Sequence, residues 1–359
     1  MSLNTKMCEL LNIKYPIILA GMAGGPTTVD LIVSVSEAGG LGTLGAAYMK
    51  PEDIRSTIKE IRLRTDKPFG VNLFCTNMND NLKGLQRVQE VLNKMRFKLE
   101  IDQEVLEVKT PQLFNEQIQV LIEEKVPIIS TAFGLMPLKW MQLAKNNGSK
   151  IITMVTTVDE AIKAEKYGVD AIVAQGSEAG GHRGTFDVEK FPNGANIGTF
   201  TLIPQVVNHV NIPVIAAGGV MDGRGLAAAL ILGAQGVQMG TAFLVTKESG
   251  AHPIYKKVIS NSTEDSTVIT KSFSGRPARG IYNEFIREFE NEKIAPLAFP
   301  SQNTITSDIR KQATKQNNHE YMSLWAGQGT RLLREDVTAK DVVNQVVEEA
   351  NSLFKQYQI

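Results

Sequence analysis

The sequence predicts an α/β fold, a (β/α)8 TIM barrel with an insertion after strand 3 and a smaller C-terminal cap domain. Eight short apolar runs alternate with helical patterns, and five of the seven intervals between their starts span 21 to 27 residues, enough for one strand and one helix. Continuously apolar runs are typical of parallel strands covered on both faces, and eight βα units close such a sheet. The predicted strands cover 16–21, 41–46, 68–74, 127–133, 150–156, 171–176, 213–219 and 236–244.

Capping residues stand where this repeat places its helices. A side-chain oxygen at the first position satisfies free backbone N–H groups, and glycine favours the turn that ends a helix. The helices predicted in this way run from Thr27 or Thr28 to Ala38, from Pro51 to Arg64, and from Asp222 to Gly233.

Two intervals, of 59 and 42 residues, exceed one βα unit and predict additional structure. The first holds a charged helical stretch to about Leu106, and the chain after the eighth strand contains a strand-like stretch at 266–273 and an amphipathic helix near 342–354. Without a Pro-rich linker, these parts are expected to pack tightly. The predicted units are a barrel of 1–74 and 111–245, an insertion of 75–110 over its mouth, a second domain of 246–337 and a terminal helix of 338–359 on the barrel.

Composition excludes several classes of partner. The chain balances 38 Lys and Arg against 38 Asp and Glu, with no basic stripe for nucleic acid. Its most apolar stretch, 225–234, is too short to span a membrane, and the N-terminus lacks a secretory signal. Cys8 and Cys75 have no metal-binding spacing and are expected to be buried thiols. We therefore expect a cytoplasmic protein without a metal site, nucleic-acid partner or membrane contact.

Residues 40–45 read GLGTLG and match the dinucleotide-binding pattern G-x-G-x-x-G. That pattern should follow a strand and open a helix, whereas here it follows a helix and forms a predicted strand. We interpret these glycines as the end of one helix and a closely packed second strand.

Glycines and polar residues gather at the predicted strand ends, where barrels of this type carry their reactive groups. Glycines after strands seven and eight offer bare backbone N–H groups to a phosphate, so a phosphate-bearing cofactor is predicted. The candidates are Gly21 and Met22 after strand one, Asn72 in strand three, Gln175, Gly180 and Gly181 after strand six, Gly218 and Gly219 after strand seven, and Gln238, Met239, Gly240 and Thr241 at strand eight.

His182 is the predicted catalytic residue, because glycines flank it at the barrel mouth. There an imidazole can take a proton or stabilise an anion near neutral pH. The other histidines, His209, His252 and His319, are expected to be peripheral, with capping or solvated roles.

Several segments resemble the nitronate monooxygenase family, formerly called 2-nitropropane dioxygenases. They are YPIILAGMAGG at 15–25, AQGSEAGGHRG at 174–184, PVIAAGGVMDGRG at 213–225, VQMGTAFL at 237–244, SFSGRPARG at 272–280 and LWAGQ at 324–328. The resemblance implies an FMN-dependent enzyme that oxidises small alkyl nitronates, such as propionate 3-nitronate, with O2 through a flavosemiquinone. The products would be a carbonyl compound and nitrite.

The resemblance also implies roles for the candidate residues. Gly21 and Met22 would lie beside the flavin ring, and Asn72 and Gln175 would bond its polar edge. Gly180 and Gly181 would let the backbone approach the cofactor, and His182 would act on substrate, as a base or as a partner for the anion. The FMN phosphate would be held by Gly218, Gly219, Gly240 and Thr241, with Gln238 and Met239 on the same strand end.

Two alternatives remain open at this point. FMN-dependent enoyl-acyl-carrier-protein reductases share the glycine motifs but use a nicotinamide nucleotide. Gln175 and Arg183 favour the monooxygenase family, because the reductases carry a glutamate and an apolar residue at the corresponding places. A flavin-binding protein without turnover is the other alternative, and the sequence leaves the oligomeric state and the physiological substrate undecided.

Overall fold

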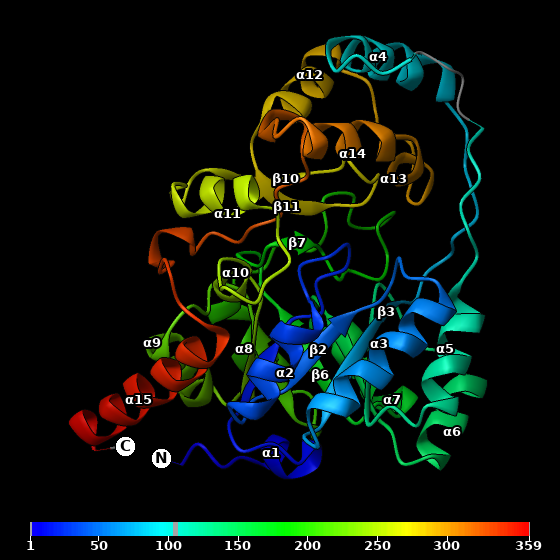
Figure 1. The fold of residues 1–359 in the computed structure, drawn as a ribbon. Helices are drawn as coiled ribbons and strands as arrows, with labels where there is room; N and C mark the ends of the chain where they lie inside the picture. Colours follow the sequence, from blue (N-terminus) through cyan, green and yellow to red (C-terminus); the bar gives the residue numbers. More distant parts are fainter. Residues whose placement is uncertain (1, 103–106, 359) are drawn as a thin grey trace.

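Eight parallel strands form a closed barrel in the computed structural model, which describes residues 2–102 and 107–358 (Figure 1). The strand order is β1-β9-β8-β6-β5-β4-β3-β2, and a parallel bridge between Ile18 and Leu41 closes the sheet. The predicted barrel is therefore confirmed. Its strands are β1 (Ile17–Leu19), β2 (Gly42–Gly45), β3 (Phe69–Phe74), β4 (Ile128–Ala132), β5 (Lys150–Val155), β6 (Ala171–Gln175), β8 (Val214–Ala217) and β9 (Gly236–Met239).

The eighth predicted run, 236–244, is too long. Strand β9 ends at Met239, and α10 (Thr241–Leu244) follows as a short helix. Because both segments are buried, the run is apolar throughout, and hydrophobicity alone does not separate a buried strand from a buried helix.

The three capped helices are confirmed. The Thr28 hydroxyl accepts from the Leu31 N–H at 3.1 Å, Pro51 is the first residue of α3, and the Asp222 carboxylate accepts from the N–H groups of Arg224 and Gly225. The helices beneath and around the barrel are α1 (Lys6–Leu11) at its bottom and, around it, α2 (Val29–Glu37), α3 (Pro51–Arg64), α5 (Phe114–Glu123), α6 (Leu138–Asn146), α7 (Val158–Tyr167), α8 (Thr199–Val207), α9 (Gly223–Ile231) and α15 (Ala339–Tyr357).

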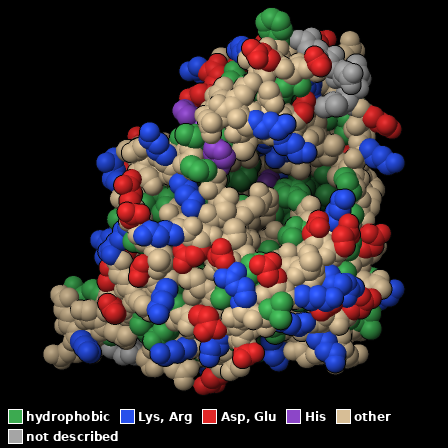
Figure 2. Space-filling view, viewed as in Figure 1, with side chains coloured by type: hydrophobic (Ala, Val, Ile, Leu, Met, Phe, Trp, Pro, Cys, Tyr) green, Lys and Arg blue, Asp and Glu red, His purple; other side chains and the backbone are tan. Residues whose placement is uncertain are grey.

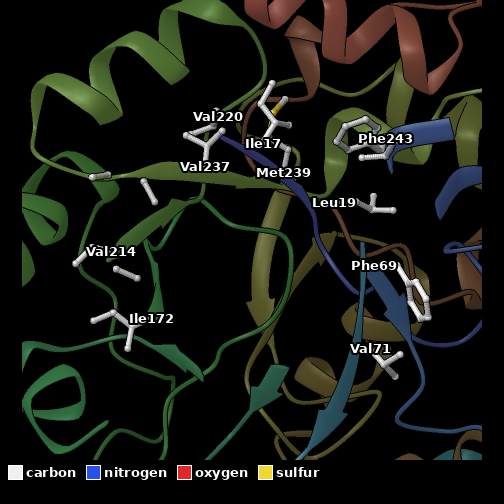
Figure 3. Packing of buried hydrophobic residues seen from close by; sticks show 14 of the residues in the cluster. Ile17, Leu19, Phe69, Val71, Ile172, Val214, Val220, Val237, Met239 and Phe243 are labelled. Atoms are coloured by element: carbon white, nitrogen blue, oxygen red, sulfur yellow. The ribbon is translucent and has the colours of Figure 1, made fainter. Parts of the chain in front are cut away.

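Both faces of the barrel strands are buried, which explains their unbroken apolar sequence. Ile17 and Leu19 of β1 point outward into the layer beneath the helices (Figure 3), whereas Ile18 points into the barrel. Helix α1 fills the bottom of the barrel, where Met7 and Leu11 join the inner cluster. Packing is close enough that a Cβ at Gly236 would lie 2.3 Å from Met7 Cε.

The glycines of residues 40–45 allow β2 to pack closely against neighbouring backbone, as the sequence indicated. A Cβ at Gly42 would lie 2.2 Å from the Ile32 carbonyl oxygen, and one at Gly45 would lie 2.4 Å from the Ala23 nitrogen. Real Cβ atoms do not approach backbone so closely. These glycines therefore serve packing.

A cap stands over the carboxyl ends of the strands (Figure 1). Residues of α4, in the insertion, share one hydrophobic cluster with residues of the segment after β9, among them Leu92 and Met95 with Phe285 and Phe289. We propose that the described residues of 75–110 and those of 246–337 form one cap domain rather than two units. Its elements are α4 (Leu85–Lys98), α11 (Pro253–Ser260), β10 (Thr267–Thr270), β11 (Ala278–Ile281), α12 (Glu284–Glu292), α13 (Ser301–Ile305), α14 (Ser307–Lys315) and the short 3-10 helices η1 (His319–Tyr321) and η2 (Thr330–Leu332).

The buried guanidinium of Arg96 ties the two segments of the cap together. It bonds Asp308 Oδ2 at 2.7 Å and the Ile305 carbonyl oxygen at 2.9 Å, both on the C-terminal segment. Helix α4 ends at Lys98, and the last part of the charged stretch predicted to about Leu106 falls at 103–106, outside the described residues.

Helix α15 packs on the barrel helices. Its start carries a capping box between Thr338 and Asp341, so it begins three residues before the predicted helix. A Cβ at Gly223 of α9 would lie 2.5 Å from the Ala350 nitrogen, so α9 and α15 are in backbone contact. Among the described helices, none combines the length and apolar composition needed to cross a bilayer.

Both cysteines are free thiols. Cys8 is buried, as expected, whereas Cys75 is only half-buried because it lies just beyond β3 at the barrel mouth. Desolvation raises the pKa of Cys75 to about 12, so this thiol stays protonated at neutral pH.

Candidate active site

A cavity of about 630 Å³ lies between the strand ends and the cap. Figure 2 shows the surface hollowed at this level, with hydrophobic side chains at the opening. All thirteen residues singled out from the sequence line it: Gly21, Met22, Asn72, Gln175, Gly180, Gly181, His182, Gly218, Gly219, Gln238, Met239, Gly240 and Thr241. In the described parts of the chain, no group of three His, Cys, Asp or Glu side chains could hold a metal ion.

His182 is held by its backbone. It forms β7 (Gly181–His182), which pairs antiparallel with β11 of the cap, so that His182 faces Ala278. The Gln175 amide braces the same segment, since its Nε2 donates to the His182 carbonyl at 3.0 Å and its Oε1 accepts from the Gly184 N–H at 2.8 Å. Gln175 thus positions the histidine in addition to lining the cavity.

Arg183 has a structural role in this loop. Its side chain is fully buried and donates to the carbonyl oxygens of Gly176 at 2.7 Å and Gln175 at 2.9 Å. Because buried carbonyl groups need partners, this guanidinium holds the turn between β6 and β7 in shape.

The His182 imidazole lies among aromatic rings and contacts one hydroxyl. Its Nε2 is 2.8 Å from Ser274 Oγ. The ring centroids around it are those of Trp325 at 5.4 Å, Phe133 at 5.6 Å, Phe74 at 6.1 Å and Phe299 at 6.3 Å. These rings form an apolar wall around the imidazole, which is half-buried and borders the cavity.

Burial lowers the pKa of His182 to about 3, and the charges of Arg276 and Arg310 contribute to the shift. The imidazole is therefore neutral at physiological pH. Arg310, on α14, donates to the Asn303 carbonyl at 2.6 Å and to Asn303 Oδ1 at 3.1 Å. Among the described residues no carboxylate forms a direct ion pair with it, although the charge of nearby Asp308, which is bonded to Arg96, acts on it. Desolvation lowers the pKa of Arg310 as well. The guanidinium lines the cavity and is hydrogen-bonded there to Asn303 rather than to a carboxylate.

The turn after β8 exposes backbone to the cavity. Gly218 and Gly219 have φ values of +114° and +72°, which side-chain-bearing residues rarely adopt. Within the described residues, the N–H groups of Gly219 and Gly240 have no hydrogen-bond acceptor. These donors are free to bind an anion at the ends of β8 and β9.

Glu178 is the single acidic side chain among the described residues that line the cavity. Its carboxylate accepts from the Thr199 N–H at 2.9 and 3.0 Å and from the Thr199 hydroxyl at 2.9 Å, and so caps α8. Because this charge is already bonded, it does not balance the cations near His182.

The cavity glycines differ in what they make room for. A Cβ at Gly21 would lie 2.6 Å from Asn72 Cβ, and one at Gly180 would lie 2.5 Å from backbone atoms of Ala326 and Gly327. A Cβ at Gly181 would meet nothing within 4 Å. Gly21 and Gly180 therefore let protein segments pack together, whereas Gly181 borders open space.

The remaining predicted residues contribute polar atoms or packing. Asn72 Nδ2 donates to Ser130 Oγ at 2.9 Å, and within the described chain its Oδ1 has no hydrogen-bond partner. Gln238 lines the cavity, whereas the Met239 side chain belongs to the core cluster (Figure 3), so its backbone is what borders the cavity.

Sequence reasoning missed several residues of the site. Trp325 and Ser274 lie within stretches quoted for the family resemblance, and that position was the available signal. Tyr48 lies in the turn just after β2, so the strand-end argument could have found it, whereas Asn303 and Arg310 lie in the cap, follow no strand of the barrel repeat and carried no signal. His252 also reaches the cavity edge, where its Nδ1 caps α11 by accepting from the Ile254 N–H at 3.3 Å, in agreement with the expected capping role.

Comparison with known proteins identifies the family. The family model for nitronate monooxygenase matches residues 4–349. A probable nitronate monooxygenase of Staphylococcus saprophyticus is 43% identical over 99% of this chain and 100% of its own length. Nitroalkane oxidase from Streptomyces ansochromogenes superposes with a TM-score of 0.90 at 36% identity, covering 98% of this chain and 99% of that one. FabK from Thermotoga maritima superposes with a TM-score of 0.79 at 34% identity, covering 99% of each chain. The chain therefore belongs to the nitronate monooxygenase family of flavin-dependent oxidoreductases.

Proposed function

We propose that this protein binds FMN in the cavity and oxidises small alkyl nitronates with O2 to a carbonyl compound and nitrite. The observation that carries the proposal is the cation of Arg310 close to neutral His182, in a cavity whose carboxylate, Glu178, is already bonded to Thr199. Fixed positive charge with low solvent exposure favours a small anionic substrate.

The donor set fits FMN. A terminal phosphate needs several N–H donors with no side chain in the way, and Gly218, Gly219 and Gly240 supply that backbone. Thr241 would add its hydroxyl, whose oxygen already accepts from the Gly327 N–H at 3.0 Å while its hydrogen stays available. We assign the polar edge of the flavin ring to Asn72 Oδ1 and to the second N–H of Gln175 Nε2.

When bound, FMN would supply the electron-accepting chemistry that oxidation of a nitronate by O2 requires. The residues of this chain bind and shield the reactants. Arg310 attracts the anion, Phe133 and Trp325 keep water away, and His182 either removes a proton from a neutral nitroalkane or contacts the nitronate.

The test begins with the purified holoprotein. Chromatography of the cofactor released on denaturation should give FMN, and FAD would contradict the phosphate assignment. Under anaerobic stopped-flow conditions, propionate 3-nitronate should reduce the flavin, whereas NADH should do so slowly or not at all. Rapid reduction of the flavin by NADH, with turnover of a crotonyl thioester, would contradict the proposal and indicate an enoyl-acyl-carrier-protein reductase instead. Bound flavin that reacts with neither would indicate a binding protein without turnover.

A further inference from the structure

Ser274 Oγ has three polar neighbours, and they restrict where its hydrogen can go. The buried hydroxyl lies 2.8 Å from His182 Nε2, 3.1 Å from the Arg276 carbonyl oxygen and 3.3 Å from the Arg276 nitrogen. The Arg276 N–H donates to Oγ in any case. The single hydroxyl hydrogen must then choose between the Arg276 carbonyl and His182 Nε2.

The two choices differ by one hydrogen bond. If the hydroxyl donates to the Arg276 carbonyl, a His182 ring protonated on Nε2 donates to Oγ, and all three contacts are hydrogen bonds. If the hydroxyl donates to Nε2, the carbonyl loses this donor and two bonds remain. Since a buried carbonyl without a donor is costly, the first arrangement is favoured.

The turn that carries Ser274 cannot easily move away from His182. Gly275 has a φ of +80°, and a Cβ there would lie 2.2 Å from the Leu297 carbonyl oxygen, so the turn is wedged against the stretch of the same cap that precedes α13. On the other side, the Arg183 N–H donates to the Pro277 carbonyl at 2.8 Å, directly beside the pairing of β7 with β11. The distance from Ser274 to the imidazole is thereby set by backbone.

We propose that Ser274 is a positioning residue that holds neutral His182 with its proton on Nε2 and leaves Nδ1 as the acceptor facing the cavity. No described residue hydrogen-bonds Nδ1, and His182 lines the cavity. Within the proposed function, on which this step rests, His182 takes a proton or a hydrogen bond at Nδ1 and does not donate to the oxygens of a nitronate. Those oxygens are then bound by Arg310.

Nitrogen-15 NMR of histidine-labelled holoprotein at neutral pH tests this directly. Protonated and unprotonated nitrogens of a neutral imidazole have well-separated shifts, and loss of a signal in His182→Asn assigns His182 among the four histidines. We expect a protonated Nε2 and an unprotonated Nδ1. A protonated Nδ1 in the wild type would overturn the proposal.

Variants of the turn separate positioning from general packing. Ser274→Ala should move both His182 nitrogens toward averaged shifts, and Ser274→Thr should restore the wild-type pattern. Ser272→Ala removes another buried hydroxyl of the same turn, one that bonds Thr270, and should change nothing at His182. If Ser274→Ala does not fold, Ser274→Cys replaces it. An unchanged tautomer in the folded variant would refute the role of Ser274.

The NMR result does not depend on turnover, so it separates this inference from the proposed function. If propionate 3-nitronate leaves the flavin oxidised but Nε2 is protonated and responds to Ser274→Ala, the substrate assignment fails and the positioning role stands. If propionate 3-nitronate reduces the flavin but the His182 shifts do not respond to Ser274→Ala, the proposed reaction stands and the positioning role of Ser274 is refuted.

Discussion

The guanidinium of Arg276 lies against the ring of Phe133, with 3.9 Å between Cζ and the ring centroid. A terminal nitrogen of the same group donates to the Thr185 carbonyl, and in the described chain its Nε has no hydrogen-bond partner. Among the described residues no carboxylate forms a direct ion pair with Arg276, although the charge of Glu160 acts on it from farther away. The charges of Arg276 and Arg310 both lower the pKa of His182. The site therefore combines fixed cations with a neutral imidazole.

This electrostatic arrangement predicts a specific acid sensitivity. The pKa of His182 is lowered from 6.5 to about 3 in the folded state, so between these pH values the unfolded chain binds the proton more readily and stability falls as pH falls. His182→Asn removes this contribution. Relative to wild type, its free energy of unfolding should improve from pH 7 to pH 5, by at most about 1.4 kcal/mol per pH unit.

Urea unfolding at several pH values measures this difference. The surface variant His209→Asn serves as the control and should follow the wild type. Parallel pH dependences for wild type and His182→Asn would show that His182 is not desolvated as described.

His182→Asn should also separate the two forms of substrate. Flavin content should be preserved, because the imidazole contacts Ser274 and aromatic rings rather than the proposed phosphate site. Loss of a general base costs about 10²–10⁴-fold in rate, so turnover of neutral nitroalkanes should fall by this factor while preformed nitronates retain much of theirs. Steady-state kinetics of wild type and variant, with neutral nitroalkanes and with preformed nitronates, measure both losses. Equal losses would indicate that His182 positions the anion, against the acceptor role of Nδ1.

Arg310→Gln should weaken nitronate binding and leave flavin content unchanged. A hydrogen bond to a charged group contributes about 1.5–3 kcal/mol, which corresponds to a rise in KM of roughly 10- to 100-fold. Arg310→Lys should recover part of the loss by restoring the charge. Lys311→Gln, on the neighbouring exposed position of α14, removes the same charge outside the cavity and serves as the control. An unchanged KM in Arg310→Gln would exclude Arg310 from substrate binding.

Gly219→Val should release FMN more than it destabilises the fold. A Cβ at Gly219 would lie 3.6 Å from Glu178 Cβ, an ordinary contact, so the cost to the fold is backbone strain at φ +72°. Gly148→Val is the matched control, since Gly148 has φ +86°, a Cβ there would meet nothing within 4 Å, and the residue lies before β5, at the end of that strand opposite the cavity. Both variants should lose about 1–2 kcal/mol of stability. Only Gly219→Val should lower flavin affinity, measured by fluorescence titration of the apoprotein.

The barrel and its strand-end residues were predictable because a repeated βα unit forces every strand end onto one face. Asn72 and Gly218 are far apart in sequence, yet the repeat alone places them around one opening. The packing of the cap was harder to predict. The contact of Arg96 with Ile305 joins positions 209 residues apart, and nothing in the sequence of either helix indicates that the two pack together. Arg310 reaches the site through the cap and was missed for that reason, whereas Tyr48 follows β2 and was within reach of the strand-end argument.

The strand that carries His182 belongs to the three-stranded sheet β10-β11-β7, not to the barrel sheet. Lifting the cap from the barrel would therefore separate the imidazole from the strand ends, or else break the pairing of β7 with β11. A cycle of cap opening at every turnover would dismantle the catalytic arrangement each time. Substrate and products should accordingly pass through the standing opening at the rim, and cross-linking the cap to the barrel should leave turnover intact.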